Sequence, residues 1–437
     1  MSLWSQAAIV AAKAPASRNR LVDFLRAASI LAVISGHWLL AAPYVGEDGF
    51  VIGNMLELAA YTEWLSWGFQ VMPIFFLVGG YANGVSWRAA QRDGKRFSTW
   101  LDARLRRLIL PVLPLVGIWV LLAIIARSLG VSAEFVEEGS KIALVPIWFL
   151  AIYAVIVLFV PLTHAAWQRW GFASFIVPAA LAIADDTLFF RGFAAVGWLN
   201  YLFVWIAVHQ LGYAWLDDRL TVPLHRLACG CFGLALLGGL TVLGPYPIAM
   251  ISVPDAGISN TLPPKLPLLA LAIAQAGFVL SAEAPLRRWL QRPALWTAAV
   301  LLNGMIMTIY LWHSTALTLT MGLTVVLGNV GLSAIPGSGA WWLARPVWLI
   351  IYALALTALM PLVARLERMP SPAKTAAAWR QILGILCTCT GLALLAYLGL
   401  GGETPMLMQA IAVVTPFIGA FTAGLLLLRR STGQPRI

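Results

Sequence analysis

Long apolar runs dominate this chain of 437 residues. A helix needs about 20 consecutive apolar residues to cross the hydrocarbon core of a bilayer, where the backbone must satisfy its own hydrogen bonds. Twelve such runs can be drawn, at 20–42, 67–87, 108–129, 142–164, 171–187, 196–215, 224–243, 264–282, 296–325, 343–364, 380–400 and 405–428. Charged residues make up only 11% of the chain, against about 25% in soluble domains. The sequence therefore predicts an all-α, polytopic transmembrane helical bundle of about twelve helices.

Lysine and arginine are distributed unevenly between the predicted loops. If the N-terminus is cytoplasmic, 24 of the 29 basic residues lie on the inner side of the membrane and five on the outer side. Cytoplasmic loops of membrane proteins carry such an excess. We therefore expect both termini to be cytoplasmic. This topology accounts for the net charge of +11, which does not indicate nucleic-acid binding.

Cysteine spacing and known sequence motifs give no sign of a metal centre. The four cysteines form two Cys-x-Cys pairs, Cys229/Cys231 and Cys387/Cys389, whose members point to different sides of a helix. Neither pair suits a disulfide or a closed metal site. The chain contains no dinucleotide-binding glycine pattern, phosphate-binding loop or His-Glu-x-x-His motif. We expect neither a metal nor a permanently bound cofactor.

The first apolar run, within residues 18–42, carries the ionisable residues Asp23, Arg26 and His37. Arg26 and His37 are eleven residues apart, so they share one helix face about 16 Å apart, and Asp23 precedes Arg26 on that face. Ionisable groups in a spanning helix usually face a bundle interior or a water-filled cavity. The pattern predicts a functional cavity. It is equally compatible with Asp23 and Arg26 pairing or extending to the interface, and with a structural His37.

The segment 88–107 is strongly basic and lies on the predicted cytoplasmic side. Most of its charges are explained by the excess of basic residues in cytoplasmic loops and by contact with anionic lipid headgroups. They are also compatible with the docking of a polyanionic cofactor. Arg104 and Arg107 stand out because they fall on one side of a helix, just before Pro111 and the third run. Two guanidinium groups so placed can bind phosphate bidentately.

Two further segments resemble parts of a binding site but also have simpler explanations. The outer segment 244–264 is rich in proline and glycine and is longer than a turn requires, as in a lid or an ordinary surface loop. In residues 308–313, TIYLWH, Tyr310 and His313 are one turn apart on one face. They line a site or belong to the aromatic belt of the membrane interface. His209 is expected to be structural or interfacial.

Six short motifs follow one another along the chain. The first is the basic residue Arg26, ten intervening positions and His37; the others are PIFFLVGGYANG (73–84), ARLRRLILP (103–111), PIWFL (146–150), LNYLFVWIAVHQLGY (199–213) and TIYLWH (308–313). Their order resembles the acyltransferase 3 family of membrane proteins, which O-acylate sugars, envelope polymers and small metabolites. Two positions depart from the family pattern, where Gly79 replaces a serine and Pro146 replaces a histidine.

The resemblance implies a ten-helix core followed by an addition. We expect a cytoplasmic N-terminal tail at 1–17 and an acyltransferase 3-like transmembrane domain at 18–365. A cytoplasmic linker would occupy 366–379, two additional transmembrane helices 380–428, and a cytoplasmic C-terminal tail 429–437. The protein would reside in a plasma membrane of bacterial type, among membrane lipids.

The resemblance also implies the roles of individual residues. His37 would be catalytic, as the general base that accepts the acceptor's hydroxyl proton, because imidazole titrates near neutral pH. Asp23 and Trp148 would support the site. The residues implied to bind acyl-CoA or to line the substrate site are Arg26, Arg104, Arg107, Tyr310 and His313.

The function implied is transfer of an acyl group, most commonly acetyl in the family, from cytoplasmic acyl-CoA to a hydroxyl group. The acceptor would be a cell-envelope glycan, a glycolipid or a small metabolite, and acyl-CoA would be a substrate. The alternative is a transporter or flippase for a small molecule or lipid, which intramembrane charges also suit. A third alternative is an inactive relative that binds an envelope polymer.

Overall fold

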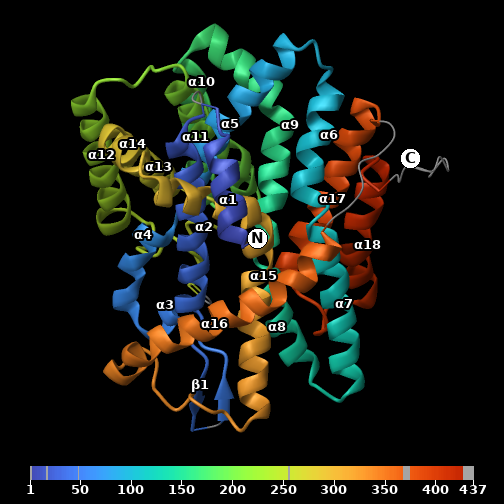
Figure 1. Ribbon diagram of the computed structural model, residues 1–437. Coiled ribbons are helices and arrows are strands. Elements are labelled where there is room, and N and C mark those ends of the chain that lie inside the picture. The colour runs from blue at the N-terminus through green and yellow to red at the C-terminus, as the bar shows by residue number, and fades with distance from the viewer. Residues whose placement is uncertain (1, 16–17, 48, 254–255, 368–374, 427–437) are drawn as a thin grey trace, which may run out of the picture. The chain divides into compact units, whose positions relative to one another are not determined.

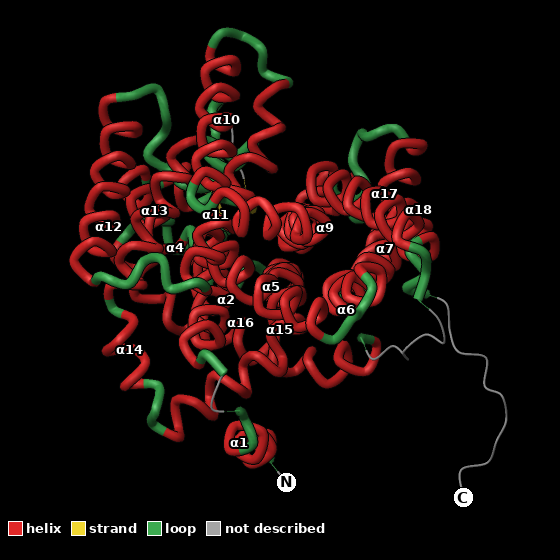
Figure 2. Tube along the Cα trace, turned by 90° about the horizontal axis from the view of Figure 1, so that it is seen from above, coloured by secondary structure: helices red, strands yellow, loops and turns green. Residues whose placement is uncertain are grey.

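Helices make up most of the computed structural model, which describes residues 2–15, 18–47, 49–253, 256–367 and 375–426 (Figures 1 and 2). The chain divides into two units. Unit 1 contains Met1–Trp87, Val160–Ile306 and Thr324–Leu349, and unit 2 contains Arg88–Phe159, Met307–Leu323 and Ile350–Ile437. Each unit is therefore assembled from segments that are distant in the sequence.

Nine helical segments of the described residues are long and apolar enough to cross a membrane. Six are single helices, namely α2 (Arg20–Leu40), α9 (Pro146–Trp170), α10 (Ala173–Phe190), α15 (Pro293–Val326), α16 (Gly339–Leu366) and α17 (Ala378–Leu398). The other three each combine several elements. The first joins η1 (Ala60–Leu65), α4 (Ser66–Phe69) and α5 (Met72–Arg92), and the second joins α6 (Phe97–Ile109) and α7 (Val112–Ser128). The third joins α12 (Pro223–Gly238) and the π-helix η3 (Gly239–Leu243). The protein is therefore a multi-pass, helical membrane protein.

A bent pair of helices is a tenth candidate span, and two more apolar runs form shorter helices. The bent pair, α13 (Leu266–Ser281) and α14 (Glu283–Trp289), turns by 57°. The remaining runs form α11 (Asn200–Leu216) and α18 (Met406–Thr422), of 17 residues each. The apolar run before α11 is partly taken by the 3-10 turn η2 (Val196–Leu199), and Pro405 stands at the start of α18. The predicted count of twelve spans is therefore not confirmed, because apolar composition does not mark where a helix is replaced by a turn.

Several elements lie outside these spans. A short hairpin pairs β1 (Tyr44–Gly46) with β2 (Gly49–Val51) in antiparallel register, and α3 (Met55–Leu58) follows it. Helix α8 (Ala133–Leu144) precedes α9. The predicted N-terminal tail contains a helix, α1 (Leu3–Ala12), which Trp296 fixes by donating its Nε1 hydrogen to the Ala11 carbonyl over 3.1 Å. The predicted tail 429–437 and residues 368–374 of the linker lie outside the described residues.

Glycines allow pairs of helices to approach closely within each unit. In unit 1, α12 runs along α13 (Figures 1 and 2), and a Cβ atom at Gly277 would overlap the backbone of Gly230. In unit 2, α17 runs along α18, and a Cβ atom at Gly384 would meet the backbone of Gly419 and Ala423. Small residues allow such backbone contact in membranes, where the hydrophobic effect does not drive helices together.

Replacing Gly277 by alanine tests this close approach. We expect Gly277→Ala to lower the midpoint of thermal unfolding in detergent, since the methyl group must push α12 and α13 apart at a cost of about 1–3 kcal/mol. Gly304→Ala is the matched control, because no atom lies within 4 Å of its added Cβ. The midpoint of the control should stay constant or rise slightly, as alanine favours helix. Equal midpoints for both variants would contradict the packing described.

Candidate functional site

Helix α2 places all three ionisable residues of the first run on one element of unit 1. The helix begins at Arg20 because Asn19 caps it, accepting the Leu21 backbone N–H on Oδ1 over 3.1 Å. Arg26 is partly buried in the second turn, and His37 is partly buried in the last turn. The structure therefore confirms the helical spacing of Arg26 and His37.

Asp23 pairs with Arg18 rather than with Arg26. Arg18 Nε donates to Asp23 Oδ2 over 2.6 Å and Nη2 donates to Oδ1 over 3.2 Å. This hydrogen bond raises the pKa of Arg18 above its ordinary value. The predicted alternative of an Asp23–Arg26 ion pair is therefore wrong: Arg18 lies outside the helix, where its long side chain can reach back to the buried carboxylate.

Arg26 is left without a partner in the described part of the chain. Its side chain makes no hydrogen bond or ion pair with any residue that the structure describes. A partly buried guanidinium group normally requires compensating acceptors. The group is therefore available to bind an anionic ligand.

Two segments of unit 1 surround the ends of α2. At its start, Asn303 of α15 donates to the Asp23 carbonyl over 2.8 Å. At its other end, the residue before His37 is Gly36, where an added Cβ atom would lie 3.3 Å from the Phe69 ring. The chain of α4 therefore packs closely beside the turn that carries His37.

Helix α6 of unit 2 carries three arginines with different environments. Arg106 is held by protein groups: its Nε donates to Asp102 over 2.8 Å, and its Nη atoms donate to the carbonyls of Gly424 and Leu425. Arg104 is partly buried, with its guanidinium 5.9 Å from the Trp100 ring centroid, and Arg107 is exposed. The structure confirms that Arg104 and Arg107 lie on a helix that ends just before Pro111. Nothing in the sequence distinguishes Arg106, which binds backbone carbonyls, from the neighbouring Arg104 and Arg107.

Tyr310 and His313 are buried inside unit 2. Tyr310 Oη donates to the Pro146 carbonyl over 2.8 Å, and its ring lies 5.9 Å from that of Phe149. His313 Nδ1 lies 2.5 Å from the Tyr310 carbonyl oxygen. Because both side chains are buried, at 2% and 0% exposure, they do not form an aromatic belt at the lipid surface. Pro146, the residue that departs from the family pattern, thus supplies a backbone acceptor for Tyr310.

Trp148 and Glu367 complete the surroundings of this helix segment. Trp148 is partly buried and meets the neighbouring Phe149 ring edge to face, with centroids 6.3 Å apart. Glu367 accepts hydrogen bonds from Thr308 Oγ1 over 2.5 Å and from Trp312 Nε1 over 3.0 Å. Burial raises the pKa of Glu367 above its ordinary value. No sequence motif singles out Glu367, although both of its donors belong to the TIYLWH motif.

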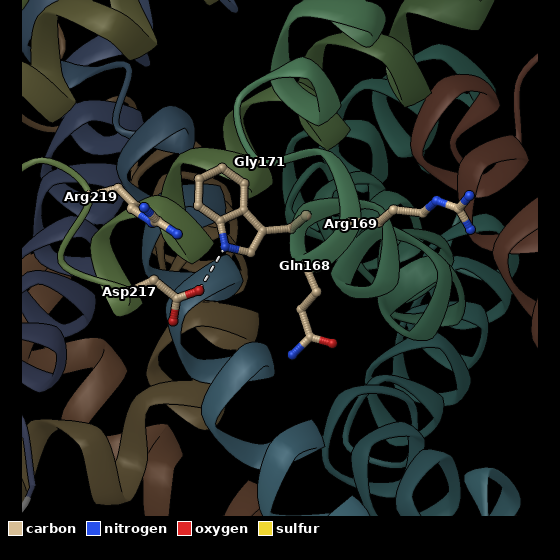
Figure 3. A pocket seen from close by; sticks show the side chains of 6 residues that line it. Gln168, Arg169, Gly171, Asp217 and Arg219 are labelled. Carbon is tan, nitrogen blue, oxygen red and sulfur yellow. Dashed lines mark hydrogen bonds between the residues drawn. The ribbon is translucent and has the colours of Figure 1, made fainter.

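A cavity of about 470 Å³ lies in unit 1, where α9 and α11 end (Figure 3). It is lined by Trp167, Gln168, Arg169, Gly171, Asp217 and Arg219. Trp167 Nε1 donates to Asp217 Oδ2 over 2.8 Å, which is the bond drawn in Figure 3. None of the predicted site residues lines this cavity. Among the described residues, no group of three or more metal-binding side chains occurs.

His209 lies elsewhere in unit 1. It is buried, with Nε2 3.2 Å from Asn83 Nδ2, and its ring meets that of Tyr213 edge to face. A Cβ atom at Gly80 or Gly212 would overlap neighbouring backbone around this contact. These contacts fit the structural role expected for His209.

The helices, the intramembrane charges and the spacing of Arg26 and His37 define a multi-pass membrane protein with a polar face on its first span. The acyltransferase 3 family model, described as an acyltransferase domain, matches residues 19–365. The chain belongs to this family, and its general activity is acyl transfer. Neither the curated proteins nor the solved structures contain a match to the chain.

The hydrogen bond of Tyr310 can be tested by removing its hydroxyl group. We expect Tyr310→Phe to lower the midpoint of thermal unfolding, with a loss of about 1–2 kcal/mol, because the buried Pro146 carbonyl loses its donor. Tyr397→Phe is the matched control, since Tyr397 is 63% exposed on α17. Its midpoint should not change. A Tyr310→Phe midpoint equal to that of the wild type would show that this bond does not stabilise unit 2.

Proposed function

We propose that the protein is an acyl-CoA-dependent O-acyltransferase, moving an acyl group, most simply acetyl, to a hydroxyl group of a cell-envelope glycan, glycolipid or small metabolite. The observation that carries the proposal is the Arg26–His37 pattern on α2, with Arg26 unpaired among the described residues, in a chain of the acyltransferase 3 family. The proposed location is a bacterial-type plasma membrane. The family match does not favour a transporter or flippase.

His37 is proposed to act as the general base. It removes the proton from the acceptor hydroxyl as that oxygen attacks the carbonyl carbon of the thioester. The new C–O bond forms, the C–S bond breaks, and the proton passes from the imidazolium to the departing CoA thiolate. The reaction therefore balances without metal or redox chemistry. Neutral imidazole accepts the first proton, and the imidazolium so formed donates it in the second transfer.

The three arginines are proposed to bind the phosphates of CoA. Arg26 has no ion-pair partner among the described residues, and Arg107 is exposed on α6, so both can accept a phosphate ligand. Arg104 lies beside Trp100 on the same helix as Arg107 and is proposed to bind phosphate as well. Guanidinium groups bind phosphate bidentately and more strongly than neutral donors.

The remaining predicted residues are proposed to position these groups. Asp23 is paired with Arg18, so its proposed role is to fix the start of α2, and it does not form an ion pair with Arg26. Tyr310 and His313 hydrogen-bond to unit 2 itself, which suits rigid lining groups. Trp148 is proposed to support them from α9. The proposed reaction uses no metal and no permanently bound cofactor.

The position of His37 in its helix suggests how donor and acceptor meet. Arg26 lies toward the end of α2 predicted to be cytoplasmic, and His37 lies in the opposite, last turn. The eleven-residue spacing corresponds to about 16 Å along the axis, a distance that an extended pantetheine arm can span. We propose that acyl-CoA enters from the cytoplasm and that the acceptor reaches His37 from outside.

Replacement of His37 tests the catalytic assignment. In inside-out membrane vesicles supplied with radiolabelled acetyl-CoA, His37→Ala should lower the rate of label transfer to envelope and metabolite fractions by about 10²–10⁴-fold, as expected for loss of a general base. His225→Ala is the control, because His225 is exposed. Transfer by His37→Ala at the wild-type rate would exclude His37 as the base. Wild-type vesicles that transport a candidate substrate without acetyl-CoA would instead support the transporter alternative.

Replacement of Arg26 tests the donor assignment separately. Arg26→Gln should raise the KM for acetyl-CoA about tenfold or more, because charge-assisted hydrogen bonds contribute about 1.5–3 kcal/mol. The KM for the acceptor should change little. Arg288→Gln, which removes an exposed arginine, is the control. An unchanged KM for acetyl-CoA in Arg26→Gln would contradict phosphate binding by Arg26.

A further inference from the structure

Helices α17 and α18 of unit 2 lie beyond the segment that matches the family, which ends at residue 365. None of the residues proposed to bind the donor or the acceptor belongs to them. They pack closely on one another, with Gly384 against the backbone of Gly419. The fully buried Thr388 of α17 also donates to the Pro416 carbonyl of α18 over 3.3 Å. The two helices therefore form one element, which we call the α17–α18 pair.

The α17–α18 pair is bonded to both ends of α6. At the start of α6, the fully buried Gln381 of α17 donates from Nε2 to the Ser98 carbonyl over 3.1 Å. Near the end of α6, Arg106 donates from Nη2 to the Gly424 carbonyl over 2.9 Å. Its Nη1 donates to the Leu425 carbonyl over 2.8 Å. Because α6 is attached at two points along its length, both its position and its rotation about its own axis are restricted.

The carbonyls that Arg106 binds follow directly after α18, which ends at Thr422. Carbonyl groups at a helix C-terminus lack intrahelical donors and carry partial negative charge, so they favour a cationic donor. The charge of Arg106 is balanced by Asp102, one turn earlier on α6, which accepts from Nε over 2.8 Å. Their side chains are 13% and 12% exposed. Each of the three guanidinium nitrogens of Arg106 thus donates to a protein group, so this residue is not available to bind phosphate.

The attachment of Arg106 fixes where its two neighbours on α6 project. Successive residues of a helix are about 100° apart, so Arg106 lies about 160° from Arg104 and about 100° from Arg107 around the axis. Arg104 and Arg107 are only about 60° apart from each other. Because Arg106 is held against the end of α18, the other two arginines project to other sides of α6. Arg104 lies beside Trp100 there, and Arg107 is exposed.

The α17–α18 pair is also bonded to α8, another element of unit 2. The fully buried Ser140 of α8 accepts on Oγ from the Leu400 backbone N–H over 2.7 Å. The Gly402 backbone N–H donates to the Ala133 carbonyl over 3.3 Å. Leu400 and Gly402 belong to the connection between α17 and α18. The pair therefore has contacts that hold it in place independently of α6.

We propose that Arg106 is a positioning residue, through which the α17–α18 pair fixes the rotation of α6 and so directs Arg104 and Arg107 toward the phosphates of the donor. This inference rests on the proposed function, in which those two arginines bind the CoA part of the donor. It gives the α17–α18 pair a role in donor binding, although the pair contains none of the proposed ligands. Arg106 acts through its neighbours and does not touch the donor.

Donor kinetics of the full-length variants in membrane vesicles test the positioning role. Arg106→Gln should raise the KM for acetyl-CoA about tenfold and change kcat less than about twofold, because misdirected arginines weaken donor binding away from the reacting atoms. Loss of folded protein alone would lower the maximal rate and leave the KM unchanged. Arg106→Lys keeps a cation beside Asp102 and a donor for the carbonyls, so it should recover most of the wild-type KM. Arg96→Gln, at an exposed arginine directly before α6, is the matched control and should have the wild-type KM.

A combined variant tests whether Arg106 acts through its neighbours. Arg104→Gln/Arg107→Gln should itself raise the KM for acetyl-CoA. Adding Arg106→Gln should then change the KM little, because the residues through which Arg106 acts are already absent. A further rise of about tenfold in the triple variant would show that Arg106 acts independently and would overturn the positioning role. A wild-type KM in the single variant Arg106→Gln would overturn it as well.

Hydrogen exchange tests the attachment of α6 without requiring acyl transfer. The backbone amides of α6 should exchange about tenfold faster in Arg106→Gln than in the wild type, while those of α8 keep their wild-type rate, because α8 retains its own contacts with the pair. Equal exchange of α6 in the two proteins would overturn the inference.

The outcomes also separate this inference from the proposed function. No acetyl transfer by the wild type, or a wild-type KM in Arg104→Gln/Arg107→Gln, would overturn the proposed reaction or donor site, and the positioning role with it. Faster exchange of α6 in Arg106→Gln would still establish that the α17–α18 pair holds this helix. A raised KM in Arg104→Gln/Arg107→Gln with a wild-type KM in Arg106→Gln would leave the proposed function intact and overturn only the inference.

Discussion

The hydrocarbon core offers no hydrogen-bond partners, so every polar group within a span must be compensated by the protein or by a ligand. Asp23 and Arg26 on α2 differ in whether a protein group compensates their charge. Arg18 reaches from outside α2 to neutralise the buried Asp23, whereas the neighbouring Arg26 has no ion-pair partner among the residues that the structure describes. Asp185 and Asp186 repeat the pattern on α10, where Asp186 is hydrogen-bonded and Asp185 has no hydrogen-bond partner in the described part of the chain. In each pair the residue with protein partners ties its helix to the surrounding structure.

The helical, multi-pass nature of the chain follows directly from its apolar runs, but the ends of the spans do not. Residues 196–199 are as apolar as the helix that follows, yet they form the turn η2, and Pro405 leaves α18 only 17 residues long. The helix α1 was also missed, because a short apolar segment near a terminus forms a stable helix only through tertiary contacts such as that of Trp296. Local composition contains none of these contacts.

For the candidate site, the spacing of residues along one helix could be predicted from the sequence. The hydrogen-bond partners that other segments supply could not. The Arg26–His37 spacing and the helical placement of Arg104 and Arg107 follow from periodicity. The choice of Arg18 for Asp23, and the use of Arg106 to hold Gly424 and Leu425, depend on residues brought together by folding. Asp185 and Asp186 had a local signal, since two adjacent carboxylates interrupt an apolar helix. Only the structure distinguishes their roles.

We propose that α2 couples a cytoplasmic donor, held at Arg26, to an acceptor that reaches His37 from the opposite side. The most direct test is the side of the membrane on which product forms in sealed inside-out vesicles given radiolabelled acetyl-CoA externally. The account predicts that the acetylated product is protected in the vesicle lumen, and that detergent exposes it to a deacetylating enzyme added outside. Product formed only on the external, cytoplasmic surface of the vesicles would contradict the account.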